Sequence, residues 1–107
     1  MEVVIGTRKL EKVLNDQRLL IKEYGLDRTK RINRRLFEFL SVANLSEIPS
    51  VPPPRCHKLH GNLEGKFAVD VSKNFRMIFE GYDDNDQLTT DRSKVVTVQI
   101  IEISDYH

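Results

Sequence analysis

Apolar residues recur at intervals of three and four positions through the first part of the chain, which is the spacing of an amphipathic helix. Between Lys9 and Tyr24 they stand at Leu10, Val13, Leu14, Leu20, Ile21 and Tyr24. Thr7 is placed to cap the start of this helix, and Gly25 to end it with a left-handed residue. The pattern therefore predicts one helix over residues 9–24, preceded by a short strand at residues 2–5.

A second helical stripe follows Gly25 and predicts a partner for the first helix. Asp27 is placed to cap this second helix. Its apolar members are Ile32, Leu36, Phe39, Leu40 and Ala43. The two helices, joined at Gly25–Leu26, are predicted to form an antiparallel hairpin.

After Gly65 the pattern changes to the alternation of half-buried strands. Residues 67–72 alternate in this way, and Lys73–Asn74 is predicted to make the tight turn into the next strand. On that next strand Arg76 points away from the face that carries Phe75 and Met77. A last strand is predicted over residues 95–103, and its apolar set changes parity at residues 100–101, which indicates a β-bulge or burial on both faces.

Two segments interrupt these patterns. Residues 48–54 read IPSVPPP, and four prolines exclude both a helix and a central strand. We therefore predict a stiff, extended connector of polyproline type. Residues 81–94 are polar and acidic, and they are long for a hairpin loop.

The order of strand, two helices, connector and three-stranded meander predicts an α+β fold of two layers. The N-terminal strand and the helical hairpin are expected to pack on an antiparallel sheet, with the first strand in the same sheet. The helices would cover one face and leave the other as a working surface. At 107 residues we expect a single domain over residues 1–107.

The composition is that of a small cytoplasmic protein. The chain is 39% hydrophobic and 31% charged, and it has neither a membrane-spanning apolar run nor a signal-peptide core at its start. Its one cysteine, Cys56, fits a reducing cytosol, and we expect it to be a small half-buried apolar residue. The net charge of +1 hides ten Lys/Arg against four Asp/Glu in residues 7–35, and two against seven in residues 80–107. This asymmetry indicates either a polyanion partner or merely solvated helix faces.

Candidate chemistry lies in the second half of the chain. Arg76 is suited to hold a phosphate bidentately, although a structural salt bridge to Asp70 or Glu80 is an equal reading of its position. The chain ends on Asp105, Tyr106 and His107, which places a titratable ring directly after an apolar strand. His57, Lys58 and His60 stand together before the sheet. A zinc site formed by the three histidines lacks a fourth strong ligand.

The segments HKLHGNLEG, KNFRMIF and the final DYH occur in an order that resembles the HigB-type toxins of the RelE/ParE superfamily, over residues 55–107. The resemblance implies a RelE-like fold and a ribosome-dependent mRNA endonuclease that uses no metal or other cofactor. It also implies that Arg76 is the catalytic arginine and that His107 belongs to the active site.

One position departs from the family pattern. The family carries a second catalytic cation, a lysine, in the loop where this chain has His60. Lys58 could supply the missing charge, and Lys73 and Tyr106 are further candidates for contact with RNA phosphate. His60 and His107 are both candidates for the acid and the base, and the sequence does not assign the two roles.

The resemblance also implies partners. They are the ribosome and mRNA, and a helix-turn-helix antitoxin of the HigA kind, through which the pair would contact operator DNA; no membrane is involved. Two alternatives stand beside this reading: a ParE-like toxin that binds DNA gyrase without enzymatic activity, and a diverged inactive family member.

Overall fold

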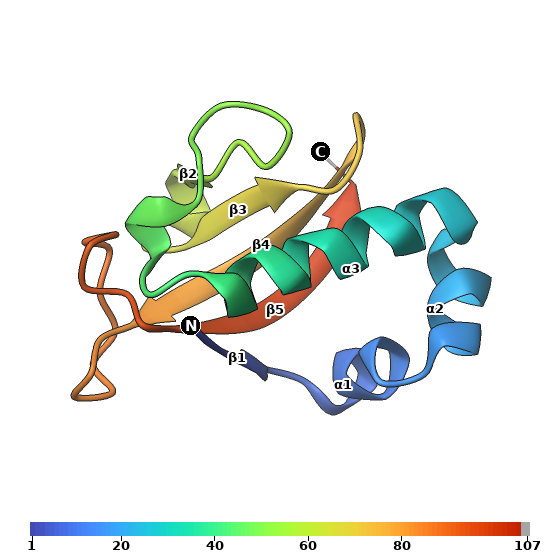
Figure 1. Ribbon diagram of the computed structural model, residues 1–107, viewed down its shortest axis with the longest axis horizontal. Helices are drawn as coiled ribbons and strands as arrows, with labels where there is room; N and C mark the ends of the chain where they lie inside the picture. Colours follow the sequence, from blue (N-terminus) through green and yellow to red (C-terminus); the bar gives the residue numbers. More distant parts are fainter. Residues whose placement is uncertain (106–107) are drawn as a thin grey trace.

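The computed structural model describes residues 1–105 of the protein, which form three helices on one face of a five-stranded sheet (Figure 1). The sheet has the order β1-β5-β4-β3-β2, and β1 runs parallel to β5 while the other neighbours are antiparallel. The strands are β1 (Glu2–Ile5), β2 (His57–Lys58), β3 (Phe67–Asp70), β4 (Phe75–Tyr82) and β5 (Thr97–Asp105). The predicted two-layer α+β fold is confirmed, including the place of the first strand, although β1 makes the sheet mixed.

The helices are α1 (Arg8–Leu14), α2 (Gln17–Tyr24) and α3 (Leu26–Ser41), followed by the 3₁₀ turn η1 (Leu45–Glu47). A second 3₁₀ turn, η2 (Gly61–Leu63), lies between β2 and β3. None of the helices within residues 1–105 is long and apolar enough to cross a membrane.

The prediction of one helix over residues 9–24 was wrong, because the chain breaks between α1 and α2. Asp16 has extended backbone angles, and its carboxylate accepts the amide protons of Arg18 and Leu19, so it caps a new helix. Thr7 caps α1 as predicted, by accepting from the amide of Leu10.

The start of α3 also differs from the prediction. Gly25 has a φ of 85° and is itself the residue before α3, without any side-chain cap. The positive φ predicted for this glycine is confirmed, whereas the cap predicted at Asp27 was wrong. Asp27 instead pairs with Arg31 one turn along the helix, at 3.2 Å.

The main core lies between the helices and the inner face of the sheet. Phe79 of β4 contacts Phe39 of α3 edge-on, with ring centroids 5.0 Å apart, and stacks on Phe67 of β3 at 5.6 Å. Leu20 and Ile32 are fully buried against the same cluster. The periodicity thus correctly predicted that Leu20, Ile32 and Phe39 pack on the sheet. It was wrong for Ile21 and Leu40, which belong to the predicted stripes but are 41% and 61% exposed.

A smaller apolar cluster lies on the opposite face of the sheet. Ile78 pairs with Glu102 but its neighbour Phe79 pairs with Ile100, so Ile101 is an extra residue in β5. The parity change predicted at residues 100–101 is therefore a β-bulge. It turns Ile101 toward this outer cluster, which is formed by Leu59, Ala68 and Ile78 with Leu63.

The prolines form a compact turn, and the predicted extended polyproline connector was wrong. The amide of Arg55 donates to the carbonyl of Val51 at 3.0 Å. Arg92, from the acidic loop, donates to the carbonyl of Ile48 and to the hydroxyl of Ser50. These hydrogen bonds satisfy polar groups of the turn, and those from Arg92 hold the turn against the rest of the protein.

Candidate functional site

Four side-chain positions form a row across the outer face of the sheet, the face that α1–α3 leave open. Arg76 of β4 is paired with Asp70 of β3 on one side and with Ser104 of β5 on the other. Arg55, two residues before β2, pairs with the carboxylate of Asp70. Directly paired residues of antiparallel strands point to the same face, so Arg76 stands on the outer face as its alternation with Phe75 and Met77 predicted.

Asp70 is held firmly at the centre of this row. Its carboxylate accepts from Nε of Arg55 at 2.7 Å and from a terminal nitrogen of the same guanidinium at 3.0 Å. Its carbonyl accepts from Nε of the buried Arg35 at 2.7 Å, and its amide donates to the carbonyl of Pro54. Charge-assisted pairs of this kind fix orientation as well as position.

An open cleft of about 590 Å³ lies at the end of the row formed by Arg76 and Ser104. Its lining includes Leu63 of η2, Tyr24 of α2 and the last residues of β5. In the cleft, the hydroxyl of Ser104 donates to the carboxylate of Glu102 at 2.5 Å. The acidic lining residues are Glu23, Glu102 and Asp105, so within the described residues the cleft carries more carboxylates than the single guanidinium of Arg76. A phosphate bound here needs further cations.

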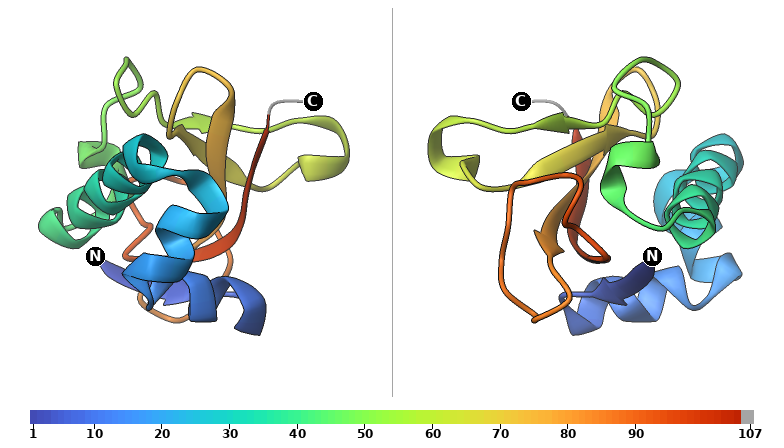
Figure 2. Two further views of the ribbon diagram at one scale, coloured as in Figure 1. Left: turned by 90° about the vertical axis from the view of Figure 1, so that its right-hand side faces the viewer. Right: turned by 60° about the vertical axis from the view of Figure 1, so that its left-hand side comes forward.

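The hairpin from β2 to β3 projects past the sheet on the side away from the helices, and is drawn in yellow-green in the left view of Figure 2. His57 is half-buried and pairs with Ala68, which places it on the outer face. Its ring nitrogen Nδ1 lies 2.6 Å from the carbonyl oxygen of Arg55. His60 stands just before η2 with 84% of its side chain exposed, and its Nδ1 lies 3.9 Å from the carboxylate of the exposed Glu64.

Lys58 is the candidate that the structure directs away from Arg76. It pairs with Phe67, whose ring lies in the main core, so Lys58 belongs to the opposite parity of the strand. Hydrogen bonds from Ser93 lower the pKa of Asp91, and Lys58 adds a smaller electrostatic contribution. Lys58 therefore lies on the side of the acidic loop.

Lys73 lies in the turn between β3 and β4, where it meets the start of α3. Together with Arg28 it lines a shallow hollow of about 410 Å³. The guanidinium carbon of Arg28 sits 4.0 Å from the centre of the Phe75 ring. Tyr24 also contacts Phe75, with the two rings nearly perpendicular, so the Phe75 ring is packed between neighbouring side chains.

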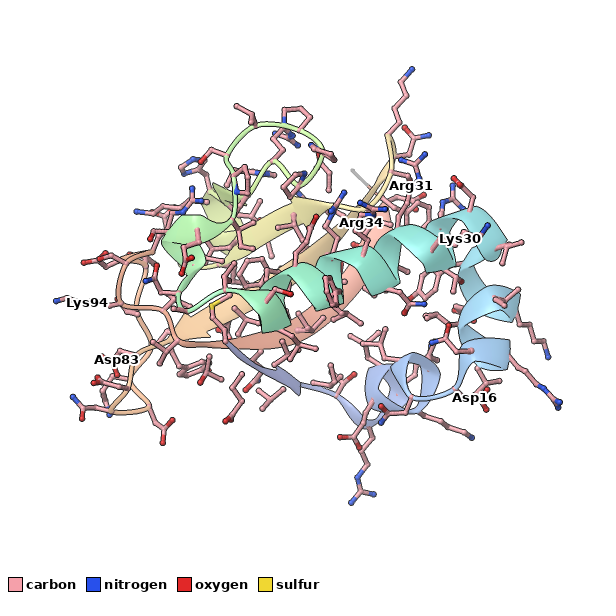
Figure 3. The ribbon with its side chains drawn as sticks, in the orientation of Figure 1. Asp16, Lys30, Arg31, Arg34, Asp83 and Lys94 are labelled. Atoms are coloured by element: carbon pink, nitrogen blue, oxygen red, sulfur yellow. The ribbon has the colours of Figure 1, made fainter. Side chains whose placement is uncertain are left out.

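The exposed cations continue along α3. Figure 3 shows Lys30, Arg31 and Arg34 along the helix from its start to its middle, far from Asp83 in the acidic loop. Arg28, Lys73 and these three residues define a basic surface. The basic and acidic segments of the sequence are thus also separated in space.

Tyr106 and His107 lie outside the described residues, so their roles stay predictions. Sequence reasoning missed Arg55 altogether and assigned His57 no catalytic role. Their positions depend on how β2 pairs with the predicted strand at residues 67–72. In the observed register, His57 lies opposite Ala68 and Arg55 lies beside Asp70.

No protein-family model matches the sequence, and no curated protein matches it. Solved structures are similar in fold. A YoeB/ParE toxin from Agrobacterium tumefaciens is 9% identical, with 100% of both chains covered and a TM-score of 0.62. A chain of a YoeB–YefM complex from Staphylococcus aureus is 16% identical, with 100% of this chain and 97% of that chain covered and a TM-score of 0.56. The YoeB dimer from the same organism gives 15% identity, the same coverage and a TM-score of 0.56.

These likenesses establish the fold. The RelE/ParE-like architecture that the motifs of residues 55–107 implied is confirmed by its YoeB/ParE-type neighbours.

Proposed function

We propose that the chain is the toxin of a type II toxin–antitoxin pair, of the HigB kind, and that it cleaves mRNA on the ribosome. The observation that carries this proposal is the position of Arg76. It stands on the open face of the sheet, at a cleft, in a row of hydrogen-bonding side chains. On a strand buried on both faces, such an arginine could not contact a substrate.

The reaction needs no covalent enzyme intermediate. The RNA 2′-oxygen attacks the adjacent phosphorus, the bond from phosphorus to the 5′-oxygen breaks, and a 2′,3′-cyclic phosphate and a free 5′-hydroxyl result. One proton leaves the 2′-hydroxyl and another reaches the leaving oxygen. Arg76 is suited to neutralise the charge that develops on the phosphate. Lys73 and the basic surface of α3 would bind neighbouring phosphates, while Tyr106 and His107 are assigned to the site by resemblance.

The proposed partner is a helix-turn-helix antitoxin of the HigA kind, and the pair would contact operator DNA through the antitoxin. Two observations support a protein partner. A fold neighbour is a YoeB–YefM toxin–antitoxin complex, and α3 exposes Phe37 and Leu40 by 69% and 61%. Co-purification of the chain with the product of the neighbouring open reading frame tests this pairing.

A ParE-like toxin that binds DNA gyrase is the second candidate. The observation that favours it is the acidic lining of the cleft, which is unfavourable to RNA. On this reading Arg76 would be an ordinary interface residue.

The decisive experiment is induced expression of the wild type, of Arg76→Ala and of a control, Lys94→Ala, which removes a cation at the opposite end of the molecule. We expect the wild type and the control to arrest translation with mRNA cut at ribosome-dependent positions. We expect Arg76→Ala to fold normally and to cut nothing. Intact mRNA in arrested cells, together with loss of gyrase supercoiling, would establish the second candidate instead.

A further inference from the structure

Asp70 lies between two guanidinium groups on the outer face of the sheet. Arg76 is its direct cross-strand partner, and side chains paired in this way have their Cβ atoms about 4.5–5.5 Å apart. Arg55 approaches from the proline turn and binds both carboxylate oxygens of Asp70, at 2.7 and 3.0 Å. One carboxylate is therefore within reach of two cations, and of these two it is Arg76 that lines the cleft.

The bidentate contact of Arg55 determines which cation this carboxylate neutralises. A guanidinium that binds both oxygens of a carboxylate fixes its plane as well as its position. The side chains of Arg55 and Asp70 are 39% and 21% exposed, so water screens the pair less than it screens a fully exposed one. Without Arg55, the charge of Asp70 would stand uncompensated beside Arg76, and the carboxylate could form the same bidentate pair with Arg76. The guanidinium of Arg76 would then be drawn toward β3 and its charge neutralised.

The main chain of Asp70 is fixed, so this carboxylate stays beside Arg76 whichever cation it binds. The buried Arg35 donates from Nε to the carbonyl of Asp70 at 2.7 Å. The amide of Asp70 donates to the carbonyl of Pro54 at 2.8 Å. Loss of Arg55 would therefore change the partner of the carboxylate and leave its position in the row unchanged.

The backbone of Arg55 is held in a conformation that favours glycine. Its φ is 44°, which residues with a side chain rarely adopt. Contacts on both sides enforce this conformation: the amide of Arg55 donates to the carbonyl of Val51 at 3.0 Å, and its carbonyl oxygen lies 2.6 Å from Nδ1 of His57. Strained backbone of this kind is concentrated at functional sites. Here the strain lies at the residue whose side chain reaches the row beside the cleft.

We propose that Arg55 is a positioning residue of the phosphate site: by binding Asp70, it keeps the guanidinium of Arg76 available to the RNA phosphate. The assignment rests on the proposed function above and deepens it. Among residues 1–105, Arg76 is the one guanidinium that lines the cleft, and three carboxylates line it as well. Pairing of Arg76 with a further carboxylate would leave the charge that develops on the phosphate unopposed. The site therefore depends on a second arginine that itself stays outside the cleft.

The test is rescue by a second substitution. Arg55→Gln keeps part of the side-chain stem and one amide donor, but it removes the charge. We expect it to cleave ribosome-bound mRNA in single turnover ~10–10²-fold more slowly than the wild type, less than the ~10²–10³-fold cost of losing such a donor outright, because Arg76 is still present. Asp70→Asn in the same chain removes the competing carboxylate and should restore most of the lost rate. Ribosome binding should be equal in all variants, because the basic surface is unchanged, so the loss falls on the cleavage step.

Arg92→Ala is the matched control for a merely structural effect. It loosens the same proline turn by removing the donors to Ile48 and Ser50, but it leaves the charges of Arg55 and Asp70 in place. Cleavage lost through this substitution should not be restored by Asp70→Asn. Urea unfolding of each variant shows whether it is folded under the conditions of the assay.

The outcomes separate this inference from the proposed function. A double variant that cleaves no faster than Arg55→Gln would show that the pair only supports the fold, and the inference would fall while the function stands. Cleavage by Arg55→Gln at the wild-type rate would overturn it equally. A wild type that leaves mRNA intact would remove both. If Arg55→Gln alone does not fold, the double variant tests the inference by itself, since mRNA left intact by a folded double variant would refute it.

Discussion

The pair formed by Arg55 and Asp70 should contribute measurably to stability, because it joins the proline turn to the sheet. The perturbation is a double-mutant cycle of Arg55→Ala and Asp70→Asn. The asparagine keeps the shape of the aspartate while it removes the charge. Arg55→Ala removes both hydrogen bonds, of 2.7 and 3.0 Å, whereas Asp70→Asn keeps one oxygen as an acceptor and removes the second hydrogen bond together with the charge.

The expected magnitude follows from the burial of the two side chains, which are 39% and 21% exposed. Fully exposed ion pairs contribute about 0.2–1 kcal/mol, and breaking a fully buried pair costs about 3–5 kcal/mol. This pair lies between the limits, so Arg55→Ala should lower the free energy of unfolding by about 1–3 kcal/mol. The coupling energy of the cycle should be about 1–2 kcal/mol.

Urea unfolding of the four proteins gives the coupling energy. The matched control is the same cycle on Arg31 and Asp27, a pair whose side chains are 52% and 79% exposed. The control should give only about 0.3–0.5 kcal/mol. A coupling at Arg55 and Asp70 no larger than the control would refute the view that this pair holds the row in place.

Three further predictions concern single positions. His60→Lys, which restores the lysine of the resembling family, should keep substantial cleavage, whereas His60→Ala should lose most of it; single-turnover rates of mRNA cleavage on the ribosome measure this. Gly81→Ala should lower the free energy of unfolding by about 1–3 kcal/mol in urea titration, because its new Cβ would lie 2.6 Å from Cγ2 of the buried Val95. Burial raises the pKa of Cys56 to about 11 against a smaller lowering by Arg92; the thiol should therefore resist thiol reagents until urea is added. The buried, neutral thiol contributes fully to stability below about 8.5, the pKa of cysteine in the unfolded chain. This contribution is lost as the pH rises toward the pKa of about 11 in the folded protein.

The sequence predicted those features that rest on side-chain period. The alternation of β4 placed Arg76 on the outer face, and the parity change in β5 located the bulge at Ile101. It failed where a polar side chain competes with the periodic pattern: the stripe continues from α1 into α2, while the cap of Asp16 breaks the helix.

Hydrogen bonds between residues that are distant in the sequence were the second cause of wrong predictions. Three prolines in a row gave no indication that Arg92 would bind the carbonyl of Ile48 and close the segment into a turn. The same limit concealed the role of Arg55, because its partner Asp70 is fifteen residues away and the pairing depends on the register of β2.

The distribution of charge separates binding from chemistry in this protein. A unit charge that lies ~8 Å from a phosphate has an interaction energy of ~2 kcal/mol with it, if the effective dielectric constant is about 20. In the cleft the attraction of Arg76 is opposed by the carboxylates of Glu23, Glu102 and Asp105. The basic surface of α3 and Lys73 lies at the other side of the β3–β4 turn. Free RNA therefore gains little by entering the cleft. On the proposed function, the ribosome supplies the binding energy through that basic surface and presents the phosphate to Arg76, and this is a physical reason for cleavage to depend on the ribosome.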